Sequence, residues 1–305
     1  MAADYDLVII GAGPGGLTAG LYAGRAMMKV LVIEKTAPGG QVIVSDWIEN
    51  YPGFPDGISG FDLGEKMKDH MLNFGAVLET AEVKSVNFSS GIKTIELSNR
   101  TITAKSVILA PGAAPRPLRI GEDKFIGKGV SFCATCDAPF FKGKTVVAVG
   151  GGDTAVQEAI YLTKFADKVY LVHRRDELRA TKILQDRAFA NDKIEFVWDS
   201  VVKSIDGFFS VENVTVENVK TQETKTLAAN GCFVWIGVLP NTTFLEGIVE
   251  LDKAGFIIAD SDMATSVKGV FAVGDARVTP LRQISTAVGD GAIAAITAEH
   301  YIENL

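Results

Sequence analysis

Several features are scarce in this 305-residue sequence, and each scarcity argues against a class of protein. It contains three cysteines, too few for the disulfide framework of a small secreted scaffold, so we expect a reducing compartment. Its 30 Lys and Arg are outnumbered by 37 Asp and Glu and form no basic stripe, which argues against a nucleic-acid partner. No apolar run approaches a bilayer span, and residues 1–6 lack the charged start of a signal peptide. We therefore expect a cytoplasmic protein with no membrane association.

An internal repeat is the most informative pattern that is present. Residues 6–34 and 145–173 align without a gap, and each reads as strand, glycine-containing turn, helix and strand. The helices are expected at 17–27 and 156–165. The strand segments are continuously apolar, which is typical of a parallel sheet covered on both faces. Each copy therefore predicts a βαβ unit of the Rossmann type, which binds a dinucleotide.

The two turns share a glycine spacing with a physical reason. The first glycine permits a tight turn, the second lets backbone N–H groups approach a pyrophosphate, and the third position must be small for helix–strand packing. A single such motif is weak, but two copies, each between a strand and a helix, favour true dinucleotide sites. The candidate residues are Gly11, Gly13 and Gly16 in the first copy, and Gly150, Gly152, Asp153, Thr154 and Ala155 in the second.

The two copies end differently, and the difference assigns their ligands. Glu34 ends the first copy, where a carboxylate accepts hydrogen bonds from a ribose hydroxyl but repels a 2′-phosphate. His173 ends the second copy and is followed by Arg174, Arg175 and Arg179. These cations indicate NADPH rather than NADH, because charge-assisted hydrogen bonds to a 2′-phosphate are strong. The alternative is a solvated basic start of a helix.

A motif near the C-terminus is a further candidate for binding the dinucleotide of the first copy, which is expected to be FAD. An apolar segment over 265–273 runs into Gly274 and Asp275, and Arg282 and Gln283 precede a small-residue helix expected at 285–300. This placement splits the first domain. The predicted fold class is α/β, with two Rossmann-like three-layer dinucleotide-binding domains, the second inserted in the first. The FAD domain is expected over 1–114 and 243–305, and the NADPH domain over 115–242, with prolines at both crossings.

Cys133 and Cys136 form a Cys-x-x-Cys pair that Asp137 follows directly. Zinc is not expected, because the three histidines are scattered and no second pair of ligands exists. Such a pair can form a reversible disulfide, and Asp137 could shuttle a proton to the dithiol as it forms. The alternative is two structural cysteines with a helix-capping aspartate. Cys232 lies in an apolar strand and is expected in the core.

Taken together, these motifs give the sequence a close resemblance, over nearly its whole length, to the low-molecular-weight thioredoxin reductases, class II pyridine nucleotide-disulfide oxidoreductases. The resemblance implies a homodimer that uses FAD and NADPH to reduce thioredoxin or a thioredoxin-like protein, with Cys133, Cys136 and Asp137 as catalytic residues. It implies that FAD also contacts Gly39, Gly40, Gln41, Asn50, Gly112, Asp275, Arg282 and Gln283. It also implies that NADPH is held by Arg174, Arg175 and Arg179.

Two positions depart from the commonest form of that family, namely Pro111 before Gly112 and the large side chain of Trp235. Two other functions compete with the reductase. One is an NADPH-independent dithiol flavin oxidase or a ferredoxin-linked relative, against which the three arginines argue. The other is a flavin-bearing sensor whose cysteines only register redox state, which catalytic turnover with a thioredoxin would exclude.

Overall fold

The computed structural model describes residues 3–45 and 47–305, which divide into two compact units. The first unit comprises residues up to Ala114 together with Leu239–Leu305, and the second is the continuous stretch Pro115–Val238. Two short strands, β7 (Ala113–Pro115) and β16 (Val238–Pro240), pair with each other where the chain crosses between the units. One α/β unit therefore interrupts the other.

The first unit is built on a seven-stranded sheet with the order β3-β2-β1-β6-β5-β4, in which β17 also pairs with β6. Its strands are β1 (Tyr5–Ile10), β2 (Val30–Glu34), β3 (Val77–Thr80), β4 (Val83–Asn87), β5 (Lys93–Leu97), β6 (Thr101–Leu109) and β17 (Val270–Ala272). Its helices are α1 (Pro14–Arg25), α2 (Gly60–Leu72) and α6 (Ile284–Glu303). Three short 3₁₀ helices are η1 (Gly40–Val44), η4 (Thr243–Leu245) and η5 (Gly274–Ala276).

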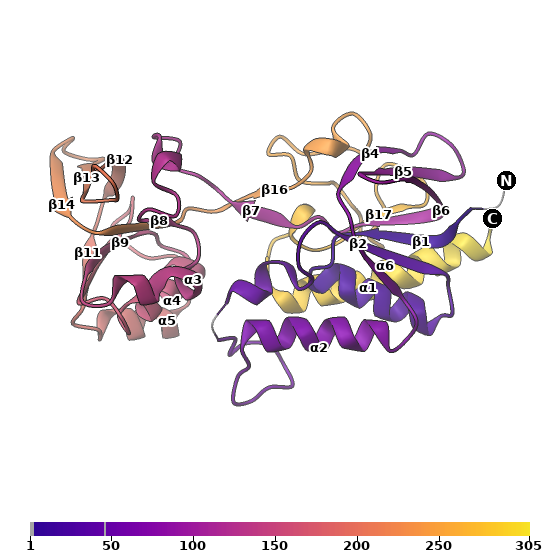
Figure 1. Cartoon of the computed structure of the whole chain (residues 1–305), viewed down its shortest axis with the longest axis horizontal. Coiled ribbons are helices and arrows are strands. Elements are labelled where there is room, and N and C mark those ends of the chain that lie inside the picture. Colours follow the sequence, from indigo (N-terminus) through magenta and orange to yellow (C-terminus); the bar gives the residue numbers. More distant parts are fainter. Residues whose placement is uncertain (1–2, 46) are drawn as a thin grey trace. The chain divides into compact units, whose positions relative to one another are not determined.

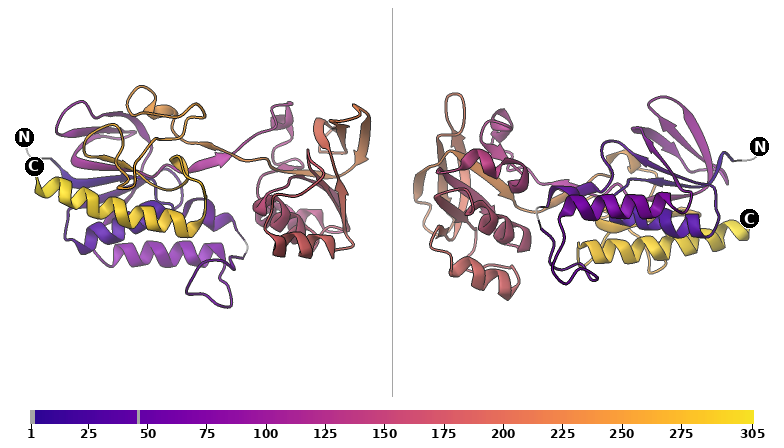
Figure 2. Two further views of the ribbon diagram at one scale, coloured as in Figure 1. Left: turned by 180° about the vertical axis from the view of Figure 1, so that it is seen from behind. Right: turned by 60° about the horizontal axis from the view of Figure 1, so that its bottom comes forward.

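Two apolar layers hold this unit together. Helices α1, α2 and α6 lie on one face of the sheet (Figure 1), and the side chains of β1 alternate between the two layers. Helix α6 runs alongside α1 (Figure 2), and the two helices approach closely at Gly291, where a Cβ atom would lie 2.3 Å from the Gly15 oxygen. The small residues expected in the C-terminal helix therefore permit helix–helix contact.

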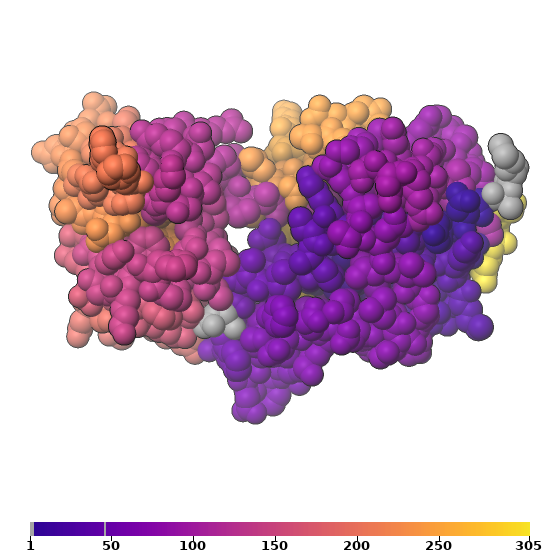
Figure 3. Space-filling model, viewed as in Figure 1, coloured from indigo at the N-terminus to yellow at the C-terminus, as the bar shows by residue number. Residues whose placement is uncertain are grey.

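The second unit repeats this plan with a five-stranded sheet of order β11-β10-β9-β15-β8. The strands are β8 (Val130–Ser131), β9 (Thr145–Gly150), β10 (Lys168–Val172), β11 (Ile194–Val197) and β15 (Gly231–Trp235). The helices on one face are α3 (Ala134–Asp137), α4 (Asp153–Leu162) and α5 (Lys182–Phe189), with 3₁₀ helices η2 (Glu122–Phe125) and η3 (Ala138–Phe141). The other face packs against an antiparallel sheet of β12 (Ser200–Asp206), β13 (Asn213–Asn218) and β14 (Thr224–Ala228), orange in Figure 3.

The parallel pairing of β1 with β2 and of β9 with β10 gives the predicted βαβ unit in both copies. The central residues of β1 and β9 are fully buried, as continuous apolar strands require. The predicted α/β fold class is confirmed. Both helices begin three residues earlier than predicted, because α1 takes Pro14 in its first turn and α4 begins at Asp153.

Candidate functional site

The first glycine turn joins β1 to α1 with almost no free space around two of its glycines. A Cβ atom on Gly11, whose φ is 107°, would lie 2.1 Å from the Ala110 oxygen. A Cβ atom on Gly16 would lie 1.9 Å from the Gly11 oxygen. Gly13 differs, because a Cβ there would meet nothing within 4 Å. Two glycines thus close the turn, and Gly13, the N-cap of α1, faces open space that suits a ligand.

Glu34 ends β2 beside this turn. Its Oε2 accepts a hydrogen bond from the Ala12 N–H at 2.9 Å, and its Oε1 accepts one from the Thr36 N–H at 3.0 Å. The carboxylate is therefore fixed next to the glycine turn, where a ribose-binding acid has to lie.

The Gly39-Gly40-Gln41 segment packs against the same turn. The Gly39 N–H donates to the Ala12 oxygen at 2.7 Å, and a Cβ on Gly40 would lie 3.1 Å from the Gly13 Cα. Both glycines have positive φ. Gln41 is exposed at the start of η1. The structure thus brings these predicted residues to the first glycine turn.

Two further predicted flavin residues meet although they are distant in sequence. The Asn50 Nδ2 donates to the Gln283 Oε1 at 2.9 Å. Residues 49–55 also line a shallow concavity of about 340 Å³. Gly112 follows β6 with a φ of 65°, and a Cβ there would meet nothing within 4 Å, so it leaves open space like Gly13.

Asp275 lies in η5, directly after β17, and burial raises the pKa of its carboxyl despite the nearby charge of Arg282. The Arg282 Nε donates to the Asp275 backbone oxygen at 3.4 Å, and its guanidinium lies 4.2 Å from the centroid of the Phe256 ring. A buried acid with a raised pKa beside an arginine is a candidate for a functional site.

Arg277 and Asp290 support this segment but belong to none of the predicted motifs. Asp290 is 6% exposed within α6 and pairs with Arg277 through two contacts of 2.7 Å. Its Oδ2 also accepts the Gly274 N–H at 3.0 Å. An acid within an otherwise small and apolar helix was the signal that could have revealed it.

The second glycine turn joins β9 to α4 in a similar way. A Cβ on Gly150 would lie 2.3 Å from the Trp235 oxygen and 2.6 Å from the Cβ of Ala155, which is itself buried. Gly152 is the N-cap of α4 and, like Gly13, faces open space. The Asp153 Oδ1 accepts the Thr181 N–H at 2.6 Å, and Thr154 is exposed.

The arginine segment folds against this turn, since the Arg179 N–H donates to the Gly151 oxygen at 2.7 Å. Arg174, Arg175 and Arg179 are all exposed. Among residues 3–45 and 47–305, no side-chain hydrogen bond or ion pair engages their guanidinium groups. Three free cations beside a glycine turn can bind an anion.

His173 occupies a different place from the exposed arginines. Its side chain is buried against the turn, where a Cβ on Gly151 would lie 2.4 Å from the imidazole Nδ1. Burial lowers the pKa of this histidine, and the charges of the three arginines lower it further. Its Nε2 is buried without a hydrogen-bond partner in the described part of the chain. The ring therefore packs under the turn, and direct contact with a nucleotide remains a prediction.

Cys133 and Cys136 form a disulfide with a Cα–Cα distance of 5.4 Å. Cys133 is half-buried and Cys136 is exposed. The buried Ser131 Oγ accepts the Cys133 N–H at 3.0 Å, and the Trp235 Nε1 donates to the Phe132 oxygen at 3.1 Å. The half-buried Asp137 ends α3, next to Cys136. Hydrogen bonds thus fix the segment that carries the cysteine pair, and Cys136 of the pair is exposed to solvent.

Cys232 lies in the core of the second unit, as predicted. Burial raises the pKa of its thiol to about 12, so it is protonated at neutral pH. No cluster of three His, Cys, Asp or Glu side chains that could hold a metal occurs in the described ranges. In the same ranges, no helix has the length and hydropathy needed to span a membrane.

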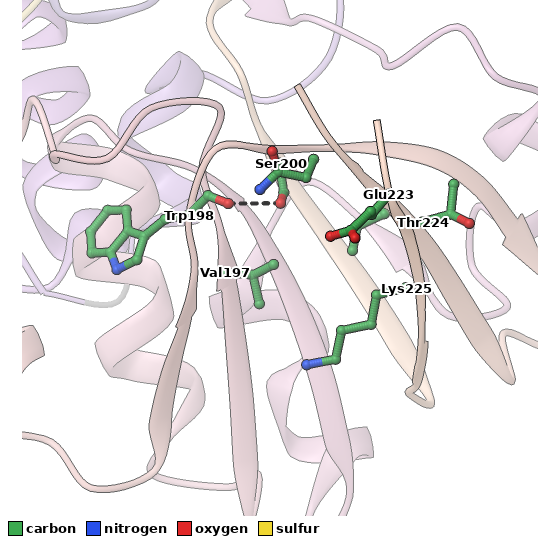
Figure 4. Close-up of a pocket in the computed structure, with 8 residues that line it drawn as sticks. Val197, Trp198, Ser200, Glu223, Thr224 and Lys225 are labelled. Atoms are coloured by element: carbon green, nitrogen blue, oxygen red, sulfur yellow. Dashed lines mark hydrogen bonds between the residues drawn. The ribbon is translucent and has the colours of Figure 1, made fainter. Parts of the chain in front are cut away.

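A concavity of about 540 Å³ lies between β11 and the three-stranded sheet of the second unit (Figure 4). Val197, Ser200, Glu223 and Lys225 are among the residues lining it, and the Ser200 Oγ donates to the Trp198 oxygen at 2.7 Å. None of the predicted cofactor or cysteine residues lines it. The predicted chemistry therefore lies outside this concavity.

Comparison with known proteins gives a consistent result. The family model described as pyridine nucleotide-disulphide oxidoreductase matches residues 5–291. A thioredoxin reductase of Peptoclostridium acidaminophilum is 49% identical over 306 residues, which cover 98% of this chain and 97% of that protein. The crystal structure of Lactococcus lactis thioredoxin reductase (FR conformation) has a TM-score of 0.97 and 43% identity, covering 99% of this chain and 100% of that one.

A ferredoxin-flavin thioredoxin reductase from Clostridium acetobutylicum is also similar, with 34% identity and a TM-score of 0.55. The alignment covers 99% of each chain. The predicted family resemblance is confirmed by these matches.

Proposed function

The chain belongs to the pyridine nucleotide-disulphide oxidoreductase family, and on that premise we propose that it is an NADPH-dependent thioredoxin-disulfide reductase with bound FAD. The observation that carries the proposal is the Cys133–Cys136 disulfide, which includes an exposed cysteine in the same unit as the second glycine turn. Two electrons and two protons convert this disulfide into a dithiol. The dithiol then reduces the disulfide of thioredoxin or a thioredoxin-like protein and becomes a disulfide again.

The first unit is proposed to hold FAD. The open space at Gly13, the fixed carboxylate of Glu34 and the Gly39-Gly40 segment against the turn fit an adenosine pyrophosphate without a 2′-phosphate. The polar groups of Asn50, Asp275, Arg282 and Gln283 would contact the rest of the flavin. When bound, the flavin accepts a hydride from the nicotinamide and passes two electrons to the disulfide.

The second unit is proposed to hold NADPH. The open N-cap at Gly152 suits the pyrophosphate, and Arg174, Arg175 and Arg179 are free to bind a 2′-phosphate. No acid corresponding to Glu34 stands at the end of β10, where His173 lies instead. NADH lacks the 2′-phosphate and cannot form two of these charge-assisted hydrogen bonds. Its binding affinity should therefore be at least about a hundredfold lower than that of NADPH.

Asp137 is proposed to hold and transfer the proton as the disulfide opens, because it lies next to Cys136 and ends the same short helix. Cys136 is proposed as the sulfur nearer the flavin. A Cys133→Ser variant should then show long-wavelength charge-transfer absorbance between its remaining thiolate and the oxidised flavin, and a Cys136→Ser variant should not. The reverse result would exchange the two roles.

We propose that the active form is a homodimer located in the cytoplasm, as implied by the resemblance to the reductases. The competing function is a ferredoxin-linked or oxidase-type flavoprotein with the same dithiol but no NADPH. The three exposed arginines favour NADPH, since such a protein has no need for a 2′-phosphate site.

The test is anaerobic stopped-flow mixing of the purified flavoprotein with NADPH or NADH, followed by an oxidised thioredoxin. Flavin bleaching by NADPH alone and reoxidation by thioredoxin are expected. A variant with Arg174 and Arg175 changed to alanine should lose the preference for NADPH without losing its flavin. Absence of bleaching by either nucleotide would overturn the proposed donor and favour the ferredoxin-linked alternative.

A further inference from the structure

Lys220 joins two carboxylates beside the arginine segment. Its Nζ lies 2.9 Å from the Asp176 Oδ2 and 3.0 Å from the Asp199 Oδ1. Asp176 directly follows Arg174 and Arg175 in sequence, and the Asp199 N–H donates to the Arg175 oxygen at 3.2 Å. Both carboxylates therefore belong to the immediate surroundings of the free guanidinium groups.

The position of Lys220 is set by its own turn. The Asn218 Oδ1 accepts the Lys220 N–H at 2.9 Å and the Thr221 N–H at 3.0 Å. The Val219 N–H donates to the Asp199 oxygen at 2.6 Å. The turn between β13 and β14 is thus fastened to the Asp199 segment and directs its lysine at the two acids.

We propose that Lys220 is a positioning residue that strengthens the preference for a 2′-phosphate by engaging Asp176 and Asp199. This inference rests on the proposed use of NADPH. Without Lys220 the two acids would be free to pair with Arg174 or Arg175, and they would repel a 2′-phosphate. Asp176 is ionised at neutral pH with or without this lysine, and the hydrogen bond from Lys220 lowers its pKa further.

The first experiment measures binding to the oxidised holoenzyme by calorimetry, with 2′,5′-ADP and 5′-AMP as probes that carry no nicotinamide. Lys220 and Asp176 are solvent-exposed and Asp199 is partly buried, so Lys220→Met should raise the Kd of 2′,5′-ADP by about threefold to tenfold and that of 5′-AMP by less than about twofold. Lys220→Arg should retain most of the affinity. The matched control is Lys203→Met, in the three-stranded sheet whose β13–β14 turn bears Lys220. It removes a lysine paired with Glu217 at 3.2 Å and should leave the affinity for both probes unchanged.

The second experiment asks whether Lys220 acts through the acids. A triple variant, Lys220→Met with Asp176→Asn and Asp199→Asn, should recover 2′,5′-ADP binding to within about twofold of the parent, because the negative charges are gone with the lysine. Failure to recover, with the flavin spectrum unchanged, would overturn the positioning role and indicate that Lys220 touches the phosphate itself.

The outcomes separate this inference from the proposed function. If the parent enzyme prefers 2′,5′-ADP and Lys220→Met binds it with the same affinity, the role of Lys220 is overturned and the proposed use of NADPH is unaffected. A parent enzyme that binds both probes equally overturns the proposed NADPH site and the inference with it. In steady-state assays the expected effect lies in KM for NADPH, with kcat unchanged.

Discussion

The side chains of Asn50 and Gln283 are joined by a hydrogen bond of 2.9 Å between the Asn50 Nδ2 and the Gln283 Oε1. Gln283 is also the N-cap of α6, where its own N–H donates to the Thr286 Oγ1 at 3.1 Å. Through Gln283 the loop bearing Asn50 is tied to the start of α6.

Asn50→Ala is expected to weaken the binding of FAD. One hydrogen bond contributes about 1 kcal/mol, so the Kd of FAD for the flavin-free protein should rise about fivefold, as measured by recovery of flavin absorbance and quenching of flavin fluorescence. Asn99→Ala, in an exposed loop of the same unit, is the control and should leave the Kd unchanged. Equal FAD affinity in the parent and Asn50→Ala would remove this residue from the flavin site.

Asp275→Asn should stabilise the flavin-free protein against unfolding while lowering its affinity for FAD. Burial raises the pKa of Asp275 above its ordinary value of 3.8, so the folded state binds its proton more tightly than the unfolded state does. Its contribution to stability is lost as pH rises through the folded pKa, and the ionised carboxylate opposes folding at neutral pH. The amide of asparagine carries no charge, so it avoids the free-energy cost of burying an ionised carboxylate. A residue that binds a cofactor often lowers the stability of the cofactor-free protein in this way.

Thermal unfolding of flavin-free Asp275→Asn should show a higher Tm than the parent at pH 7, and the difference should shrink as pH falls toward 3.8. Asp262→Asn changes an exposed acid of the same unit and serves as the control. A lower Tm for Asp275→Asn at pH 7 would contradict the prediction.

Cys232 should be chemically silent in the folded protein. Its thiol is fully buried and its pKa is raised to about 12, so almost no thiolate exists at pH 8. Mass spectrometry after maleimide treatment should find no label on the oxidised protein and labels on Cys133 and Cys136 after mild reduction. Cys232 should react only after denaturation. Its labelling in the native oxidised protein would show that the core of the second unit opens.

Local patterns predicted both glycine turns and the cysteine pair because those features depend on neighbouring residues. The contacts of Gly16 with the Gly11 oxygen and of Gly150 with Ala155 lie within a single βαβ unit, and the cysteines lie three residues apart. The contacts of Gly11 with Ala110 and of Gly150 with Trp235 come from strands outside that unit. The meeting of Asn50 with Gln283 depends on the packing of α6 onto a distant loop, which no local pattern encodes. The resemblance to a family supplied those positions.

Tertiary packing shapes two local features of the second unit. The loop between β12 and β13 covers residues 207–212, because β13 begins only at Asn213. Val211 in the longer loop is 1% exposed and its N–H donates to the Lys128 oxygen at 3.0 Å, so burying that side chain lengthens the turn. The ring of His173 lies inside the unit because Gly151 leaves room for it, which its place after β10 did not reveal.

Asp290→Asn is expected to destabilise the first unit more than any exposed ion-pair change. The Arg277–Asp290 pair is largely buried, with side-chain exposures of 14% and 9%, and removing one partner of such a pair costs about 3 kcal/mol. Because Asp290 also accepts the Gly274 N–H, the variant should also retain FAD less well.

Urea unfolding of the flavin-free variants gives the free-energy difference, and gel filtration of the holoenzyme gives FAD retention. Glu217→Gln breaks the more exposed Lys203–Glu217 pair and should cost less than about 1 kcal/mol. If Asp290→Asn cost no more than Glu217→Gln, the Arg277–Asp290 pair would not stabilise the fold. If instead stability fell while FAD retention stayed at the parental level, Asp290 would support the unit without positioning Gly274 and Asp275 for the flavin.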